Sequence, residues 1–182
     1  MKAAVILVLG QAPQYQDFQE PAVQDNEILV EVRAAGLHPI VKSIASGAHY
    51  SAKGEVPMIA GIDGVGTRAD GVRVYFGGAR KPWGTMAERC AVPVSMCLPL
   101  PDGIGDVQAA AIANPGMSAW LSLQDRAALA TGETVLILAL PVLLASWPFR
   151  RRGTWVLAGS LPRGAMSKPW PRRMSKIGRA HV

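Results

Sequence analysis

One stretch, T-G-E-T-V-L-I-L-A-L-P-V-L-L-A at residues 131–145, constrains the fold of this chain most strongly. Gly132 ends an alanine-rich run, and the apolar, β-branched run at 135–138 is typical of a parallel strand that is covered on both faces. In nucleotide-binding units, such a strand is followed by a glycine-rich turn whose backbone N–H groups face a pyrophosphate. Residues 139–144 contain no glycine and place Pro141 where the turn should tighten. The chain therefore begins a nucleotide site and lacks the turn that completes it.

The excess of positive charge in this chain lies at its C-terminal end. The 182 residues are enough for one hydrophobic core, or for one domain and part of a second. A net charge of +6 would favour a polyanionic partner. However, residues 150–182 hold nine basic and no acidic residues, whereas residues 1–149 hold ten basic and all 13 acidic residues. The charge thus predicts a basic C-terminal segment and not a basic domain.

Cysteine content and hydropathy indicate a cytoplasmic protein. Cys90 and Cys97 match neither a disulfide framework nor a C-x-x-C metal motif, so we expect two reduced thiols. The apolar run at the start is short and carries one lysine, which favours a first strand over a secretion signal. The apolar run at 135–145 is shorter than the roughly 20 residues that cross a bilayer. We therefore expect no membrane partner.

Short strands separated by glycine and proline fill the first hundred residues, and helices come afterwards. Strands are expected at 2–9, 27–33, 57–67, 72–76 and 84–92, and helices at 40–47, 107–113 and 115–123. Asp70-Gly71 predicts a hairpin turn, and Asp106 is expected to cap the helix at 107–113. This order predicts a β-barrel-like domain followed by an α/β unit.

Eight motifs follow one another between residues 1 and 138. They are M-K-A-A-V, E-I-L-V-E-V-R-A-A-G-L-H-P, P-x-I-A-G-I-D-G-V-G, D-G-V-R-V-Y-F-G-G, G-T-M-A-E-R-C-A-V-P, L-P-D-G-I, N-P-G-M-S-A-W and T-G-E-T-V-L-I-L. In this order and spacing they resemble the medium-chain dehydrogenase/reductase superfamily, specifically its zinc-independent quinone-oxidoreductase-like branch. The resemblance implies a mainly β fold, with a chaperonin-10-like (GroES-like) substrate-side domain over 1–125 and the start of a Rossmann domain at 126–138.

The resemblance also implies an activity. Intact members of this branch are expected to reduce quinones or activated carbonyl compounds by hydride transfer from NADPH, with a small-molecule substrate as the partner. A homodimer is a further expectation for intact relatives. Because the nucleotide-binding turn is missing, we expect this chain to bind no NADPH and to be inactive.

Residues 139–182 depart from the family pattern and are expected to form a poorly ordered basic tail. One missing base near codon 138 or 139 would explain the departure. Reading the third base of each codon with the first two bases of the next permits G-A-T-G-V-A-G after Leu138, which is the glycine-rich turn of the family. Tryptophan has a single codon, so Trp147 before Pro148 must give Ala and Trp155 before Val156 must give Gly. Both are residues that the helix–strand unit of the family requires.

The metal-binding positions of zinc-dependent relatives are altered in this chain. Those relatives carry a cysteine after A-G-hydrophobic and later a G-H-E triplet, where this chain has His38 and Gly61-Ile62-Asp63. An aliphatic side chain cannot bind zinc. His38 and Asp63 could in principle hold a metal together, but a lone histidine at a turn near the cleft is the favoured interpretation. We expect no metal.

The resemblance supplies four candidate site residues. His38 takes the position of a polar residue that faces the cleft in this branch, and Tyr50 lies in a loop that lines the pocket of relatives; both are candidate catalytic residues. Ser118 matches a hydroxyl residue that approaches the nicotinamide, and Asn114 precedes the same motif; both are candidates for cofactor binding. Structural roles compete, with Asn114 as a cap before Pro115 and Ser118 as a hydroxyl on a helix surface.

Three other functions stay open. The β domain could serve as a non-catalytic GroES-like module for binding or dimerisation, or the chain could be a relative of zinc-type alcohol dehydrogenases. Trp147, Trp155 and Trp170 lie among basic residues, a pattern that also occurs in nucleic-acid binding arms. The apolar runs of this segment and its lack of a glycine-serine linker argue against such an arm.

Overall fold

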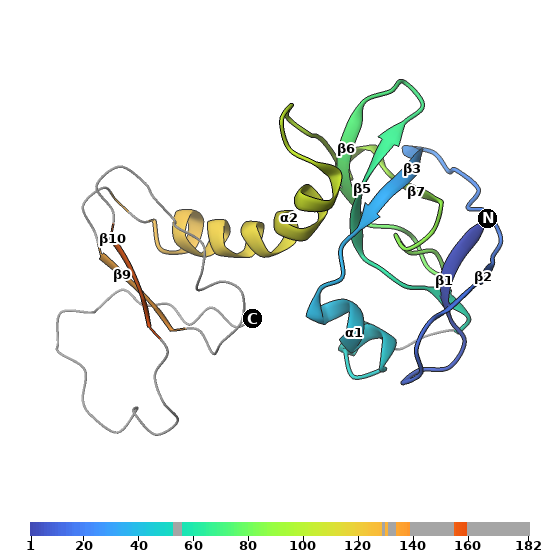
Figure 1. Ribbon diagram of the computed structural model, residues 1–182, viewed down its shortest axis with the longest axis horizontal. Coiled ribbons are helices and arrows are strands. Elements are labelled where there is room, and N and C mark those ends of the chain that lie inside the picture. Colours follow the sequence, from blue (N-terminus) through green and yellow to red (C-terminus); the bar gives the residue numbers. More distant parts are fainter. Residues whose placement is uncertain (53–55, 129, 131–133, 139–154, 160–182) are drawn as a thin grey trace. The chain divides into compact units, whose positions relative to one another are not determined.

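The computed structural model describes residues 1–52, 56–128, 130, 134–138 and 155–159 (Figure 1). These residues belong to two compact units, Met1–Asn114 and Pro115–Val182, and each unit is described by itself. Within the described residues, no helix is both long and apolar enough to cross a membrane.

A curled five-stranded sheet forms the body of the first unit (Figure 1). Its strand order is β7 (Arg89–Pro93), β3 (Glu27–Ala35), β5 (Asp63–Arg68), β6 (Arg73–Gly77) and β8 (Cys97–Pro99), and all neighbours are antiparallel. The two edge strands, β7 and β8, are joined by one short 3₁₀ turn, η2 (Val94–Met96). Such a short connection between opposite edges requires the sheet to curl, which confirms the predicted β-barrel-like domain.

A second, three-stranded sheet has the order β2 (Gln14–Asp17), β1 (Lys2–Ile6) and β4 (Met58–Ile59). The strand predicted at 57–67 is therefore two strands, β4 and β5, in two different sheets. The break between them contains Gly61, whose φ of +97° suits glycine and where a Cβ would lie 2.4 Å from Thr85 Oγ1. No strand was predicted at β2, whose side chains are mostly exposed at the edge of this sheet and therefore show no apolar pattern.

The interior of the curled sheet holds the main hydrophobic core. Val30, Val74, Phe76, Cys90 and Val92 are all fully buried there. Both thiols are free and lie in strands, as the sequence predicts. Burial raises the pKa of the Cys90 thiol to about 12, so this thiol stays protonated and unreactive at neutral pH.

The helix α1 (Pro39–Ala45) confirms the short helix predicted at 40–47. Proline occupies its first turn, where no backbone N–H is needed. The chain leaves the helix through Gly47, whose φ of +79° is the left-handed conformation typical of a helix end. A 3₁₀ turn, η1 (Tyr50–Ala52), follows where the sequence indicated a loop.

The two helices predicted at 107–113 and 115–123 are a single helix, α2 (Asp106–Leu121), which continues as a π-helical turn, η3 (Ser122–Arg126). Pro115 lies inside α2 instead of starting a new helix, although it removes one backbone hydrogen bond. The predicted cap, Asp106, is the first helical residue. Its Oδ1 accepts hydrogen bonds from Nε and Nη2 of Arg73 at 2.9 and 2.6 Å, so this carboxylate ties the helix start to β6.

The second unit contains two parallel strands, β9 (Thr134–Leu138) and β10 (Trp155–Gly159), paired from Thr134↔Trp155 to Leu138↔Gly159. The strand β9 confirms the parallel strand predicted at 135–138. The strand β10 lies in the segment 139–182, which was predicted to be poorly ordered, and the apolar run W-V-L-A-G is the sequence signal for it. The glycine-free turn at 139–144 and most of the predicted tail lie outside the described residues.

Candidate functional site

Three polar side chains meet at a buried point in the first unit. His38 immediately precedes α1, Asp63 begins β5, and Tyr75 lies in β6. His38 Nε2 lies 3.2 Å from Asp63 Oδ2, and the Tyr75 hydroxyl donates a hydrogen bond to the same oxygen at 2.7 Å. His38 is 8% exposed and Asp63 is 3% exposed. We call these three residues the polar cluster.

The local fold explains why the polar cluster forms. Tyr75 pairs with Val65 across β5 and β6, so it is a diagonal neighbour of Asp63 on the same face of the sheet. Gly36 has no side chain and so leaves the space that the side chains of His38 and Asp63 occupy. A Cβ at Gly36 would lie 2.4 Å from His38 Nε2 and 2.8 Å from Asp63 Oδ1. The cluster thus depends on a residue without a side chain at this position.

Burial and the Asp63 carboxylate both act on the Tyr75 hydroxyl of the polar cluster. Burial, and then the hydrogen bond and negative charge of Asp63, raise the pKa of the Tyr75 hydroxyl above its ordinary value. Tyr75 therefore stays protonated and remains a donor. Asp63 Oδ1 is buried and has no hydrogen-bond partner. A buried carboxylate oxygen without a partner destabilises a fold, so its retention at this place needs an explanation.

The polar cluster does not fit a zinc ion. Structural and catalytic zinc sites use three or four side-chain ligands from cysteine, histidine and carboxylates. Within the described part of the chain, no group of three or more His, Cys, Asp or Glu side chains could hold a metal ion. His38 and Asp63 are two such side chains, and Asp63 Oδ2 already accepts a hydrogen bond from the Tyr75 hydroxyl.

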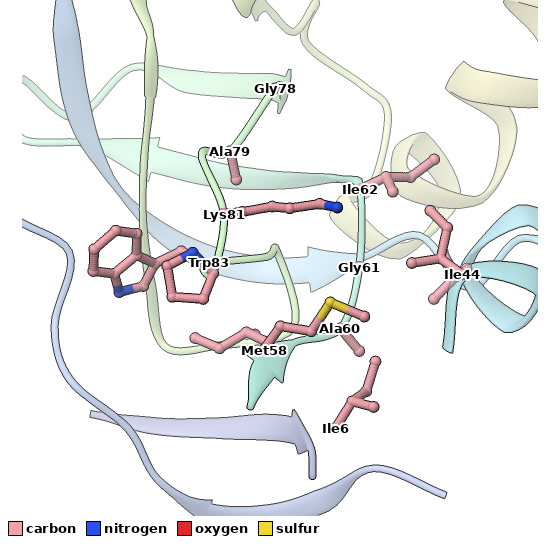
Figure 2. Close-up of a pocket in the computed structure, with 13 residues that line it drawn as sticks. Ile6, Ile44, Met58, Ala60, Gly61, Ile62, Gly78, Ala79, Lys81 and Trp83 are labelled. Atoms are coloured by element: carbon pink, nitrogen blue, oxygen red, sulfur yellow. The ribbon is translucent and has the colours of Figure 1, made fainter. Parts of the chain in front are cut away.

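A separate apolar cavity of about 220 Å³ lies beside α1, between the three-stranded sheet and the segment at 78–83 (Figure 2). Ile6, Ile44, Met58 and Ile62 contribute apolar side chains, and Lys81 is the only charged residue among the described residues that line it. One wall is held in place by Trp83, whose Nε1 donates to the Gln19 carbonyl at 3.0 Å. The cavity exceeds the roughly 150 Å³ that accepts benzene and is smaller than the roughly 300 Å³ of ordinary ligand pockets.

Comparison with known proteins places the first unit in a family. No family model matches the chain. The chain is 32% identical over 129 residues to the quinone oxidoreductase of Rattus norvegicus, across 66% of this chain and 39% of that protein. The solved quinone oxidoreductase from Thermus thermophilus matches with a TM-score of 0.66 and 35% identity, over 76% of this chain and 45% of that chain. The N-terminal part of this chain is a quinone-oxidoreductase-like relative within the medium-chain dehydrogenase/reductase superfamily.

Two further matches cover a similar or larger share of the chain. The phthioceranic/hydroxyphthioceranic acid synthase of Mycobacterium tuberculosis is 32% identical over 120 residues, which is 61% of this chain and 6% of that protein. An alcohol dehydrogenase superfamily protein from Novosphingobium aromaticivorans shares the fold, with a TM-score of 0.71 and 24% identity, over 89% of this chain and 54% of that chain. The chain spans less than half the length of the quinone oxidoreductases that it matches. The expected GroES-like fold of the first unit is confirmed.

The four candidate site residues take different environments in this quinone-oxidoreductase-like chain. His38 joins the polar cluster. Tyr50 is 82% exposed, and its ring lies on that of His49 with centroids 4.3 Å apart, so it does not join the cluster. Asn114 is half-buried inside α2, not a cap, and Ser118 is exposed one turn later. Neither His38 nor Tyr50 is among the described residues that line the cavity.

Sequence reasoning missed Tyr75 and treated Asp63 only as a possible metal donor. Tyr75 occupies an alternate position of a hairpin strand and lies in the motif D-G-V-R-V-Y-F-G-G, which was used only for the family resemblance. The signal was its offset from Asp63 across the Asp70-Gly71 turn, which places both side chains on one face of the hairpin.

The residues present do not fit a nucleotide at the expected position. Such a site would follow β9, where residues 139–144 supply no glycine for the close approach of the backbone to a pyrophosphate. Pro141 in that segment also lacks a backbone N–H. We therefore assign no step of a reaction to NADPH in this chain.

Proposed function

We propose that this chain derives from an NADP(H)-dependent oxidoreductase that reduces quinones or activated carbonyl compounds by hydride transfer, and that it carries the substrate-side domain of that enzyme. The supporting observation is the sequence and structural match to quinone oxidoreductases, including the enzyme of Thermus thermophilus, which was also solved in complex with NADPH. His38 and Tyr50 are proposed as residues that contact the substrate, and Asn114 and Ser118 as residues that contact the cofactor. The cytoplasmic location and the homodimer of intact relatives belong to the same proposal.

We further propose that the chain as it stands is inactive. The strand β9 is present, but residues 139–144 after it contain no glycine for the close approach of the backbone to a pyrophosphate, and Pro141 lacks a backbone N–H. A missing base near codon 138 accounts for this loss and for the basic composition of 150–182.

The test compares two chains. One is the chain as given, and the other carries the G-A-T-G-V-A-G turn and the residues that the shifted frame encodes. NADPH binding is measured by fluorescence titration, and quinone reduction by the loss of NADPH absorbance. We expect binding and turnover only in the restored chain. Tight NADPH binding by the given chain would contradict the proposal, and the coding DNA across codons 136–142 would show whether a base is missing.

A non-catalytic binding module is the second candidate. It is favoured by the first unit itself, which has its own hydrophobic core and its own apolar cavity. In that case the given chain would be monodisperse and would bind small apolar molecules in the absence of NADPH. Loss of such binding on the substitution Ile62→Trp, which fills the cavity, would separate this candidate from nonspecific adsorption.

A further inference from the structure

We propose that Asp63 is a positioning residue, which holds the Nε2 proton of His38 so that Nδ1 becomes the ring nitrogen that exchanges a proton with an oxygen of a bound molecule. The ligand part of this statement rests on the proposed function, whereas the position of the proton on the ring does not. The geometry that points to this role is the 3.2 Å contact between His38 Nε2 and Asp63 Oδ2.

The contact determines which nitrogen carries the proton. An ionised carboxylate can only accept hydrogen bonds, so the ring nitrogen that faces it must donate. In a neutral imidazole one nitrogen donates and the other accepts. With the proton on Nε2, the lone pair of His38 is therefore on Nδ1. The same division of roles between an aspartate and a histidine is used in catalytic triads.

The Asp63 carboxylate is fixed in place by its surroundings. The Tyr75 hydroxyl donates to Oδ2 at 2.7 Å. The backbone carbonyl of Asp63 accepts from the Gly36 N–H at 2.9 Å and from the fully buried Thr85 hydroxyl at 2.8 Å. These contacts hold both the main chain and the side chain of Asp63, so that the orientation of the His38 ring is set by residues of β5, β6 and the segment before α1.

Two further observations support a functional role over a structural one. Both donors of the polar cluster converge on Oδ2, while Oδ1 is buried without a partner. An aspartate that served packing alone would not need a buried, unpartnered oxygen. Among the described residues, the buried side-chain nitrogens without a hydrogen-bond partner are Nε of Arg80 and Nε of Arg89. His38 Nδ1 is not one of these buried atoms.

His38 Nδ1 can serve a ligand oxygen in either protonation state. As a neutral nitrogen it accepts the proton of a hydroxyl, such as that of a hydroquinone. When the ring is protonated, Nδ1 donates to a carbonyl oxygen, such as that of a quinone. In both states the Nε2 proton stays on the ring and faces Asp63. Only one proton moves, and it passes between Nδ1 and the ligand oxygen.

The tautomer of His38 can be observed directly in the full chain. Histidine labelled with ¹⁵N is incorporated, and two-bond ¹H–¹⁵N spectra at mildly alkaline pH distinguish a protonated ring nitrogen from one with a lone pair. The variant His38→Gln identifies the His38 signals. We expect Nε2 to be protonated in the wild-type chain. In Asp63→Asn the amide can donate to Nε2, so we expect the proton to move to Nδ1.

The control is Tyr75→Phe, which removes the other donor to Oδ2 but keeps the carboxylate, and it should preserve the wild-type tautomer. A proton on Nδ1 in the wild-type chain would overturn the proposal, and this holds even if Asp63→Asn does not fold. A folded Asp63→Asn variant with an unchanged tautomer would overturn it as well.

A titration with methylhydroquinone tests the ligand part. We expect a shift of the His38 Nδ1 signal that exceeds any shift of the Nε2 signal. The expected tautomer without a response to hydroquinone would refute the substrate-side function and leave the role of Asp63 on the ring intact. The two failures are therefore distinguishable.

Discussion

The substitution Gly36→Ala should disrupt the polar cluster through one added methyl group. That methyl group would lie 2.4 Å from His38 Nε2 and 2.8 Å from Asp63 Oδ1, whereas ordinary contacts of a Cβ are 3.4 Å or longer. His38 and Asp63 are both buried, so neither has free space into which it can move. The His38 ring must therefore leave its 3.2 Å contact with Asp63, or the strand must shift.

The magnitude follows from two terms. Forcing an extra methyl group into a packed site costs about 1–3 kcal/mol. Loss of a buried hydrogen bond to a charged group adds about 1.5–3 kcal/mol. We expect the free energy of unfolding of the first unit to fall by about 2–5 kcal/mol. This is less than the sum of the two costs, because movement of the His38 ring away from Asp63 also relieves the crowding by the methyl group. Urea unfolding of the full chain, followed by far-UV circular dichroism, measures this change.

The matched control is Gly105→Ala. A Cβ added at Gly105 would have no heavy atom within 4 Å, and this glycine has no positive φ, so the same substitution meets open space. Its carbonyl accepts the first hydrogen bond of α2 from Ala109, so we expect a change within about 1 kcal/mol. Equal effects of the two substitutions would refute the argument that Gly36 is needed for close approach within the polar cluster.

Three other predictions concern the first unit. Phe76→Ala should lower the free energy of unfolding by about 3–5 kcal/mol in urea, because Phe76 is fully buried in the curled sheet, while Val94→Ala, at 48% exposure, should change it by less than about 0.5 kcal/mol. Burial raises the pKa of Cys90 from 9.0 to about 12, so the native thiol should resist a thiol-specific disulfide reagent at pH 8 until urea unfolds the chain. The free energy of unfolding should also fall as the pH rises from about 9 toward 12. Rapid labelling of the native chain would contradict this reasoning. Arg73→Met removes the bonds to Asp106 and should cost about 1 kcal/mol, with a smaller cost in high salt, because both side chains are about one-third exposed.

Much of the first unit followed from the sequence because its signals are local. Asp70-Gly71 forms the predicted hairpin turn, with the Gly71 φ at +82° and the Val72 N–H donating to Asp70 Oδ1 at 3.1 Å. Pro39 and Gly47 bound the predicted short helix. Each of these features depends on the backbone preferences of one or two residues, which a single sequence displays.

The errors arose where tertiary contacts decide the structure. The run at 57–67 has the composition of one strand, yet Gly61 turns the chain from one sheet into another beside Thr85. Pro115 is a strong signal for a helix start, yet α2 passes through it. The pairing of His38 with Asp63 was considered only as a metal site, and the third member, Tyr75, depends on strand register across a hairpin.

The order of elements along the chain has a consequence for synthesis in the cell. All five strands of the curled sheet end by Pro99, and the turn that joins the edge strands is complete before α2 begins. An N-terminal domain whose residues have all been synthesised can fold while the ribosome still adds later residues. A coding change after codon 138 would therefore leave every strand of the curled sheet unaltered, and this sheet would be able to form before the altered residues leave the ribosome.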